Sequence, residues 1–508
     1  MSSKAIIRCD YFTGSGVGHL KRSAVLATAL QRRGVEVTLV VDSRPLNFNW
    51  VLNLNIEVVS SMVFFEDEDA ERIIEYSKAN EVGMVVVDSY RITNNWVQKV
   101  KSAGLRVVAI DDLSRLESAD LRVDYAPLSM PLPNCSEELL GPSYFITDTK
   151  RSTRGKSLKP QSIIFHAGGN GDFSSNELTI QCLLREARQW NLRVTWLIAN
   201  QASKGWLQEK NLIEASDTLR EWEVNVSMHW GAYDIVVGPA STSLYEAIMQ
   251  GSLPISYTIS PTQKDERSCW LSLGHALHIT NKESEDTSCI KNTLRNAVEH
   301  YVALREYLFF HSKELDGLGV HRIIDHLLQE AGLSARAPSP KPMSQANEVR
   351  PCEFVDAAEF LNARNAEPVR SLSTNDREII WPEHLNWWLS NNAEKFVVLN
   401  GGETKAFFWH RSRVLDGNKF LIGGWFPANS QPIFDAAVRL LDWQLKQCAM
   451  DYDGHLWVAT INPANRAVIA LNKKFGFQEA SLDTRKYLED LFPGTPNNFV
   501  ALERPARL

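Results

Sequence analysis

The chain has 508 residues, which is too long for one hydrophobic core and favours about three domains. Hydrophobic residues make up 44% and charged residues 23% of it, as in ordinary globular proteins. The net charge of −7, without a long basic block, argues against a nucleic-acid partner. Seven scattered cysteines with no CxxC pair, and no run long enough to span a membrane, predict a cytoplasmic protein with no membrane partner and no metal site.

The first elements predict a βαβ unit with a glycine-rich loop. Ala5–Cys9 is a short apolar strand, and residues 19–34 carry apolar side chains at helical spacing and end on a glycine. Residues 35–41 (VEVTLVV) form the next predicted strand. The loop RCDYFTGSGVGHLKR, residues 8–22, therefore lies where the first strand ends and the helix begins.

The alternation of strands and helices continues through two series. In the first, the apolar stretches 82–88 and 105–111 are buried strands that each close on an aspartate. The second opens at residues 161–166, is followed by the loop AGGNGD, and has later strands at 192–198, 235–237 and 253–259. We therefore expect an α/β fold with two doubly wound lobes, residues 1–150 and 151–330, and ligands bound beyond the carboxyl ends of the strands.

The chain changes character after the second lobe. Residues 331–351 contain four prolines and no apolar period, which predicts an extended linker. Residues 352–508 contain phenylalanine-rich strands at 395–400 and 405–409 and a helix at about 433–447. This pattern predicts a third domain of α+β type.

His19 stands directly after the glycine loop, at the start of the predicted helix. The loop lacks the Gly-Lys-Ser/Thr ending of a Walker P-loop and the spacing of the dinucleotide fingerprint. Helix N-terminal amides stabilise bound anions and disfavour imidazolium, so a neutral His19 beside a diphosphate suits general-base work on water. The alternatives are a flexible strand–helix turn and a structural histidine with both nitrogens satisfied.

The same loop resembles the opening of the UDP-sugar hydrolases of pseudaminic acid biosynthesis. Their pattern R-x-D-x(5)-G-x-G-H-x-x-R is matched at Arg8, Asp10, Gly16, Gly18, His19 and Arg22. The resemblance continues through residues 87–90, 110–112, 124, 168–172, 238–243, 246, 251 and 262–263. It implies a glycosyltransferase-B-like fold and metal-free, cofactor-free hydrolysis of UDP-2,4-diacetamido-2,4,6-trideoxy-β-L-altropyranose. It further implies His19 as the base, with Asp10 and Tyr90 as catalytic residues and Gly16, Gly18 and Arg22 in substrate binding.

The second lobe suits the UDP end of such a substrate. Ser241, Thr242 and Ser243 open a helix after a strand, where hydroxyls and amides can cap the helix and face a diphosphate. Glu246, one turn on, can accept from both ribose hydroxyls, or it can simply complement the helix dipole. The remaining expected substrate-binding residues are Gly168, Gly169, Asn170, Thr262 and Gln263. Thr262 departs from the usual Asn of the family.

Two further patterns have a structural interpretation that we favour. His275 and His278 have a spacing that could bind a metal, but no third ligand is near in sequence, which favours surface or helix-end histidines. Asp111 and Asp112 could form a magnesium pair, but their place at a strand end, without a Lys/Ser phosphate loop, favours helix capping and hydrogen bonding of the preceding turn.

The third domain resembles GNAT acetyltransferases, specifically the branch that acetylates the amino sugar of the same pathway. The matching residues are Arg364–Arg370 with His384 and Trp387, then Asn465 and Ala470–Phe477. The resemblance implies acetyl-CoA as a cofactor and Asn465 and Asn472 as acyl-CoA-binding residues. Two departures stand against simple acetyl transfer: the stretch 427–434 has no glycine for a pyrophosphate loop, and Asn472 replaces the tyrosine acid. A degenerate module for substrate binding or assembly is the alternative.

Together these features predict a UDP-amino-sugar hydrolase fused to a GNAT-like domain. If both parts are active, acetylation of the 4-amino group precedes hydrolysis. A glycosyltransferase of the same two-lobed fold is the main alternative, and a nucleotide-sugar-binding scaffold without catalysis is the second. No feature of the sequence predicts an oligomeric state.

Overall fold

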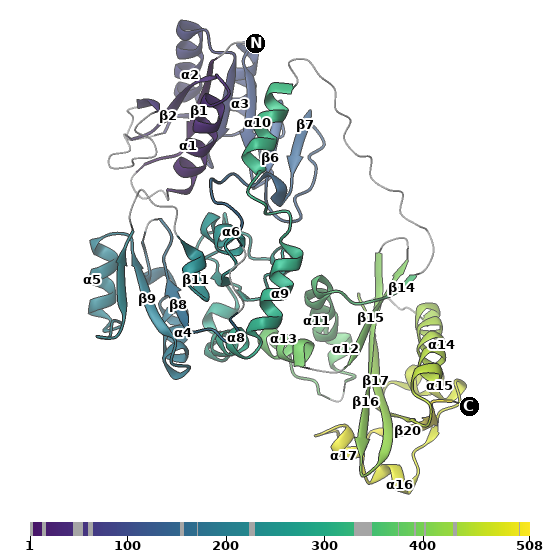
Figure 1. Ribbon diagram of the computed structural model, residues 1–508. Coiled ribbons are helices and arrows are strands. Elements are labelled where there is room, and N and C mark those ends of the chain that lie inside the picture. The colour runs from purple at the N-terminus through teal and green to yellow at the C-terminus, as the bar shows by residue number, and fades with distance from the viewer. Residues whose placement is uncertain are drawn as a thin grey trace. The chain divides into compact units, whose positions relative to one another are not determined.

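The computed structural model describes residues 4–12, 17–43, 54–58, 64–152, 157–169, 171–222, 229–329, 348–373, 375–390, 393–400, 403–429, 434–496 and 498–507. The chain divides into two compact units, residues 1–336 and 337–508 (Figure 1). Gly16, Asn170 and most of the expected linker lie outside the described residues.

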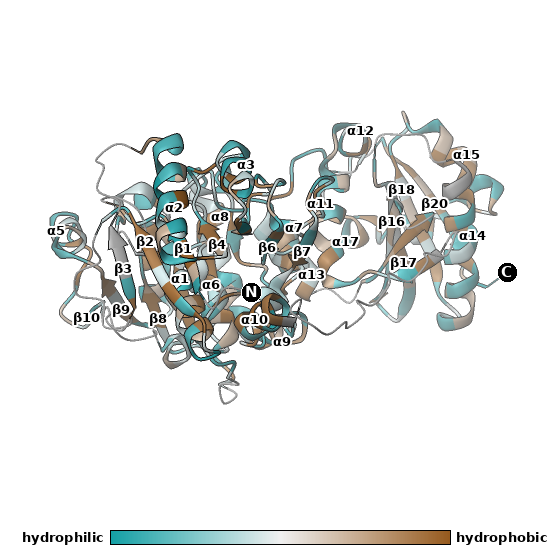
Figure 2. Ribbon diagram, turned by 90° about the horizontal axis from the view of Figure 1, so that it is seen from above, coloured by the Kyte–Doolittle hydropathy of each residue, from teal (hydrophilic) through white to brown (hydrophobic). Residues whose placement is uncertain are grey.

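The first lobe of unit 1 is built on a parallel sheet of seven strands. Their order is β3-β2-β1-β4-β5-β6-β7. The strands are β1 (Lys4–Cys9), β2 (Glu36–Val41), β3 (Asn55–Val58), β4 (Met84–Asp88), β5 (Arg106–Ile110), β6 (Leu121–Asp124) and β7 (Glu137–Leu140). The helices are α1 (Gly18–Gln31), α2 (Glu66–Asn80) and α3 (Asn94–Ser102). Figure 2 shows the hydrophobic colour concentrated on strands such as β4, as the buried valines there require.

The second lobe repeats the same winding with six parallel strands. Their order is β10-β9-β8-β11-β12-β13. The strands are β8 (Ser162–Phe165), β9 (Arg193–Ile198), β10 (Thr218–Glu221), β11 (Ile235–Pro239), β12 (Leu253–Tyr257) and β13 (His278–Ile279). The helices are α4 (Glu177–Gln189), α5 (Gln201–Glu209), α6 (Thr242–Met249), α7 (Arg267–Leu271), α8 (Thr287–Glu299) and α9 (Tyr301–His311). The predicted α/β fold of two doubly wound lobes is confirmed.

One element of the expected second lobe packs on the first lobe instead. Helix α10 (Gly319–Gln329) contacts α1, and Arg33 forms an ion pair with Asp325. Gly319 lies against the backbone of Phe145, where a Cβ atom would overlap the carbonyl oxygen. The last helix of unit 1 therefore returns to the lobe that contains the N-terminus.

Unit 2 is an α+β domain built on a mixed sheet, as expected. The strand order is β14-β15-β16-β17-β18-β20-β19. The strands are β14 (Glu348–Pro351), β15 (Glu394–Asn400), β16 (Glu403–Leu415), β17 (Asn418–Pro427), β18 (Leu456–Ile461), β19 (Gln478–Glu479) and β20 (Val500–Pro505). The helices are α11 (Ala357–Asn365), α12 (Glu367–Arg370), α13 (Trp381–Ser390), α14 (Phe434–Asp451), α15 (Arg466–Lys474), α16 (Leu482–Arg485) and α17 (Leu488–Leu491).

The boundary of this domain differs from the predicted one. Residues 348–351, which we assigned to the linker, form β14 and pair with β15. The short segment carries no apolar alternation and ends on a proline, and proline is tolerated on an edge strand such as this one. The third domain therefore begins before residue 352.

Candidate active site

In both sheets of unit 1, the direction in which successive strands are added reverses after the third strand. The order reverses between β1 and β4 in the first lobe and between β8 and β11 in the second. In doubly wound sheets the loops beyond these strand ends form the binding crevice. His19 and Asp88 come from the first switch point, while the loop that contains Gly168 and Gly169 and the start of α6 come from the second.

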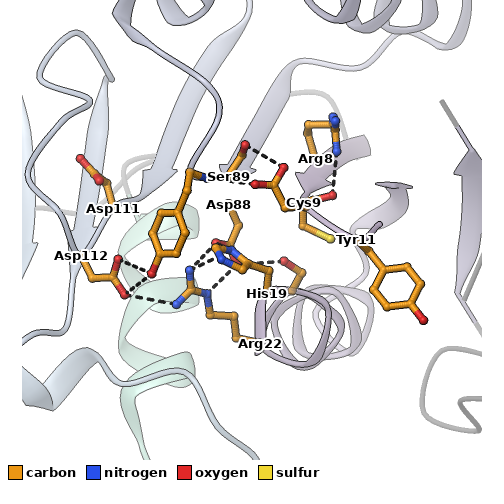
Figure 3. Close-up of polar contacts among 12 residues, drawn as sticks. Arg8, Cys9, Tyr11, His19, Arg22, Asp88, Ser89, Asp111 and Asp112 are labelled. Atoms are coloured by element: carbon orange, nitrogen blue, oxygen red, sulfur yellow. Dashed lines mark hydrogen bonds and ion pairs between the residues drawn. The ribbon is translucent and has the colours of Figure 1, made fainter. Parts of the chain in front are cut away.

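His19 and Asp88 form the centre of the site (Figure 3). His19 lies in the first turn of α1, and Asp88 is the last residue of β4 and is fully buried. Nδ1 of His19 is 2.6 Å from Oδ1 of Asp88. An ionised carboxylate can only accept, so Nδ1 carries the hydrogen and the neutral ring keeps a lone pair on Nε2. His19 is thereby oriented as a proton acceptor.

Arg22 keeps the Asp88 carboxyl ionised. Its Nε is 2.6 Å from Oδ2 and its Nη2 is 2.5 Å from Oδ1 of Asp88. Burial opposes ionisation of Asp88, but the charge of Arg22, together with the hydrogen bonds from Arg22 and His19, outweighs burial and holds the pKa of this carboxyl well below its usual range. Arg22 is buried and both of its bonds to Asp88 are charge-assisted, so it holds the carboxylate that orients His19. Its part in substrate binding stays a prediction.

Tyr90 lies on the other side of the imidazole. Its ring meets that of His19 edge-on, with 4.5 Å between centroids, and its hydroxyl donates to Oδ1 of Asp112 at 3.0 Å. Burial, and then the charge of Asp112, raises the pKa of Tyr90 well above its usual range. The phenol therefore stays protonated at neutral pH and acts as a hydrogen-bond donor.

Asp112 has a different role from the one expected of it. It accepts from the hydroxyls of Tyr90 and Tyr125 and lies 3.4 Å from Nη1 of Arg22. Asp111 also differs from the expectation, because its carboxylate accepts from the backbone amides of residues 113, 115 and 116 in the turn that follows it, and not from the preceding turn. No group of three metal-ligating side chains occurs within the described ranges.

Both carboxylate oxygens of Asp10 accept hydrogen bonds from the loop after β4. Its Oδ1 accepts from Ser89 Oγ at 2.8 Å and from Arg91 Nη2 at 2.6 Å, and its Oδ2 accepts from the backbone N–H of Tyr90 at 3.0 Å. Asp10 therefore positions the backbone of Tyr90. The catalytic role that the resemblance implies for Asp10 stays a prediction.

The loops of the two lobes meet beside His19. A Cβ atom on Gly169 would lie 2.6 Å from Cγ2 of Val17 and 3.0 Å from its nitrogen, so this approach requires glycine. Gly168 has a positive φ of 70°, and its N–H donates to Nδ1 of the buried His166 at 3.2 Å. On the other side, Gly18 faces Oγ1 of Thr242. Gly18, Gly168, Gly169 and Thr242 are thus gathered at one place, as predicted.

The serines at the start of α6 do not cap it through their side chains. Ser241 occupies the N-cap position, yet its hydroxyl has no capping hydrogen bond and instead lies 2.9 Å from the hydroxyl of Ser243. The expected side-chain cap is therefore wrong.

Glu246 is buried and already has partners. Its Oε1 is 2.5 Å from Nζ of Lys21, and Thr147 Oγ1 and Trp230 Nε1 lie 3.4 Å from its oxygens. Thr262 and Gln263, in contrast to Glu246, form their hydrogen bonds within one loop. Thr262 bonds to Ser260 and Gln263 to Ile259, both in the loop after β12. The described structure gives those two residues no contact with the His19 centre.

His275 and His278 are buried in the second lobe, so our expectation of surface histidines is wrong. Ser256 Oγ is 2.8 Å from Nε2 of His275 and 2.9 Å from Nδ1 of His278. Burial lowers the pKa of both imidazoles. Helical spacing did not reveal this position, because the second histidine belongs to the edge strand β13.

Unit 2 contains a cavity of about 730 Å³ between two diverging strands. Strands β17 and β18 pair at only two positions, Phe420 with Leu456 and Leu421 with Trp457, and separate beyond them. Asn465 and Asn472 both line the cavity. Asn465 caps α15 by accepting from Val468 N–H at 3.3 Å, and Asn472 donates to the Val468 carbonyl at 2.9 Å.

Sequence reasoning missed two residues of the unit 1 site. Asp88 was noted as the end of a strand but was not assigned to the site, although an aspartate closing a buried strand is a usable signal. Nothing in the sequence indicated that Lys21 belongs to the site, because its partner Glu246 lies 225 residues away.

No protein-family model matches the chain, and no curated protein matches it significantly. Among solved structures, the Staphylococcus aureus MnaA–UDP complex matches with 12% identity and a TM-score of 0.48, covering 66% of this chain and 99% of that one. Acinetobacter baumannii MurG matches with 13% identity and a TM-score of 0.48, covering 64% of this chain and 99% of that one. An N-acetyltransferase from Staphylococcus aureus Mu50 covers 32% of this chain and 99% of its own, with 15% identity and a TM-score of 0.26.

Such low similarity carries no conclusion about substrate or chemistry. The resemblance to pseudaminic-acid-pathway hydrolases and to GNAT enzymes stays a prediction from the sequence motifs. Within the part of the chain that the structure describes, no helix is both long and apolar enough to cross a membrane.

Proposed function

We propose that unit 1 hydrolyses a UDP-linked 2,4-diacylamino-2,4,6-trideoxyhexose to the free sugar and UDP. The observation that carries this proposal is the 2.6 Å contact between His19 Nδ1 and the ionised Asp88. It leaves Nε2 as the basic nitrogen, at the switch point where a doubly wound sheet binds its ligand. The identity of the sugar rests on the motif resemblance alone.

The reaction needs one proton acceptor and one leaving group. Nε2 of His19 takes a proton from water as the water oxygen attacks the anomeric carbon, and the bond from that carbon to the UDP oxygen breaks. UDP departs with the electron pair of that bond. The proton remains on His19, where Asp88 stabilises the imidazolium, until it is lost to solvent. Tyr90 keeps its proton. Its ring packs edge-on against the imidazole of His19, and its hydroxyl donates to Asp112.

The first test asks which nucleophile attacks. In ¹⁸O-labelled water the label should appear on the anomeric carbon of the free sugar, and UDP should remain unlabelled. Turnover that appears only when a second sugar or a protein acceptor is added would support a glycosyltransferase. Absence of any UDP release in both conditions would support a binding scaffold.

The second test asks whether His19 is the base. His19→Gln should reduce turnover by on the order of a hundredfold or more while UDP affinity stays within a few-fold. His321→Gln provides the matched control, because His321 is an exposed histidine of the same unit. Unchanged turnover in His19→Gln would contradict the assignment.

A second candidate function, acyl transfer from acetyl-CoA by unit 2, is favoured by the diverging strands β17 and β18. Backbone groups of separated strands are open to an elongated ligand, and the cavity walls are largely apolar. However, Asn472 cannot deliver a proton to a leaving thiolate. The stretch 427–434 also has no glycine that would let the chain approach a pyrophosphate closely, so we expect weak acetyl-CoA binding, with a Kd above about 100 μM or roughly 5.5 kcal/mol or less. Calorimetric titration of the full chain gives the answer, and micromolar affinity would support an active acyltransferase.

A further inference from the structure

Lys21 and Glu246 join the two lobes of unit 1 beside His19. Lys21 lies in the first turns of α1, two residues after His19, and Glu246 lies in α6 of the other lobe. Their charged atoms are 2.5 Å apart. The Glu246 side chain is almost fully buried, and that of Lys21 is only about one quarter exposed, with a side-chain relative exposure of 27%.

The charge of Lys21 is maintained by two carboxylates, those of Glu246 and Asp148. Burial opposes this charge, but Glu246 in particular, with a contribution from Asp148, outweighs burial and raises the pKa of Lys21. Lys21 therefore carries a full positive charge at neutral pH. An ammonium on a flexible four-carbon stem can also change partners without movement of the backbone.

Glu246 is not left without donors when Lys21 departs. Thr147 Oγ1 and Trp230 Nε1 both lie 3.4 Å from its oxygens, which is long for a hydrogen bond and leaves room for stronger donors. Vicinal ribose hydroxyls are such donors. A nucleoside bound at Glu246 would compete directly with Lys21 for the same carboxylate.

The position of Lys21 also suits the diphosphate. Gly18, three residues before it, faces Thr242 at the start of α6, so the first turn of α1 lies beside the N-terminus of α6. Helix N-terminal amides favour anions, and a diphosphate gains negative charge as its bond to the sugar breaks. A cation beside these amides stabilises the leaving group.

We propose that Lys21 is an exchangeable cation of the hydrolase site. In the ligand-free protein it is paired with Glu246. When the ribose of a nucleoside diphosphate sugar takes Glu246, the ammonium turns to the diphosphate and stabilises the charge that develops on it. This inference rests on the proposed function for its substrate, but its binding signature does not require turnover.

The experiment compares uridine with UDP by calorimetry on the full chain. In Lys21→Met, UDP affinity should fall by about tenfold or more because a charge-assisted contact is lost. Uridine affinity should stay equal or rise, since Glu246 no longer has to exchange a partner. Lys21→Arg should keep UDP affinity within a few-fold. Lys159→Met, at an exposed lysine of the same unit, is the matched control and should change neither affinity.

A second background isolates the exchange. In Glu246→Gln, the further change Lys21→Met should leave uridine affinity unchanged relative to its own parent, because no ion pair remains to be broken. Equal losses of uridine and UDP affinity in Lys21→Met would show that the ion pair only holds the two lobes together, and would overturn the proposal. Unchanged UDP affinity would overturn it as well.

The binding and turnover results together distinguish a failure of this inference from a failure of the proposed hydrolysis. If the binding signature is found but His19→Gln retains full turnover, the proposed hydrolysis fails while the exchange at Lys21 stands. If His19→Gln loses turnover and Lys21→Met behaves as the native chain does, only the exchange fails. Lack of any UDP binding by the native chain would overturn both.

Discussion

The site of unit 1 and the cavity of unit 2 are built in opposite ways. Around His19, buried charges are matched: Asp88 is held by Arg22 and His19, and Glu246 by Lys21. Around the unit 2 cavity, buried polar atoms such as Trp457 Nε1, Thr460 Oγ1 and Arg364 Nη1 have no hydrogen-bond partner within the described residues. The contrast indicates that one region is organised before any ligand arrives, whereas the other has bonding capacity that its own side chains do not use.

This difference predicts unequal sensitivity to polar substitutions. Removing one member of a matched buried set leaves another charge uncompensated, which costs far more than the pair contributes. Removing a buried group that has no partner costs little and can stabilise the fold. The following predictions test this contrast, from the largest expected effect to the smallest.

Asp88→Asn should have the largest effect on unit 1. The change leaves the buried Arg22 without its two strongest acceptors, which should cost about 3–5 kcal/mol of unfolding free energy. Turnover should fall as well, since an amide no longer fixes the His19 tautomer. Urea unfolding and UDP release measure the two effects. Asp112→Asn, at a more exposed carboxylate of the same cluster, is the control and should cost clearly less. Equal losses in the two variants would contradict the matched-charge description.

The sequence was sufficient for the parts of this site that depend on local pattern. Short apolar strands, a glycine loop and a histidine at a helix start predicted β1, α1 and the position of His19. The same reasoning gave the second glycine loop and the start of α6. Each of these features is determined by residues that are close together in the sequence.

The remaining parts depend on sheet order and on distant contacts. Asp88 reaches His19 because β4 pairs with β1, and hydrophobic periodicity does not reveal which strands are neighbours. Lys21 meets Glu246 only because the two lobes approach each other. The same limit explains why α10, which contacts α1 of the first lobe, was assigned to the second lobe.

The stability of unit 1 should also depend on pH through His166. Burial lowers the pKa of this imidazole to about 3, from its ordinary value of 6.5. The unfolded chain takes up a proton below about pH 6.5 while the folded protein does not, so the stability contribution is complete above that pH and is lost as the pH falls. At pH 5 the loss from His166 should be about 2 kcal/mol.

Urea unfolding at pH 7.5 and pH 5 measures this effect. In His166→Asn the difference between the two pH values should shrink by the same amount, whatever the variant's stability at pH 7.5. His321→Asn, at an exposed position, should leave the difference unchanged. If His166→Asn keeps the full pH dependence, His166 is not the group that protonates on unfolding.

The smallest predicted effect comes from a matched pair of threonines, one in each unit. Thr38 in β2 has its hydroxyl 3.1 Å from Tyr76 Oη and 3.0 Å from Asn55 Nδ2, whereas Oγ1 of Thr460 in β18 has no partner among the described residues. Valine has nearly the same shape and suits a strand, so each substitution removes mainly the hydroxyl. Thr38→Val should destabilise unit 1 by about 1 kcal/mol, and Thr460→Val should change unit 2 by about 0.5 kcal/mol or less, or stabilise it. Separate unfolding transitions of the two units in the full chain report these changes. A loss in Thr460→Val as large as that in Thr38→Val would mean that the Thr460 hydroxyl is satisfied in solution, and the contrast between the two regions would then not hold at this position.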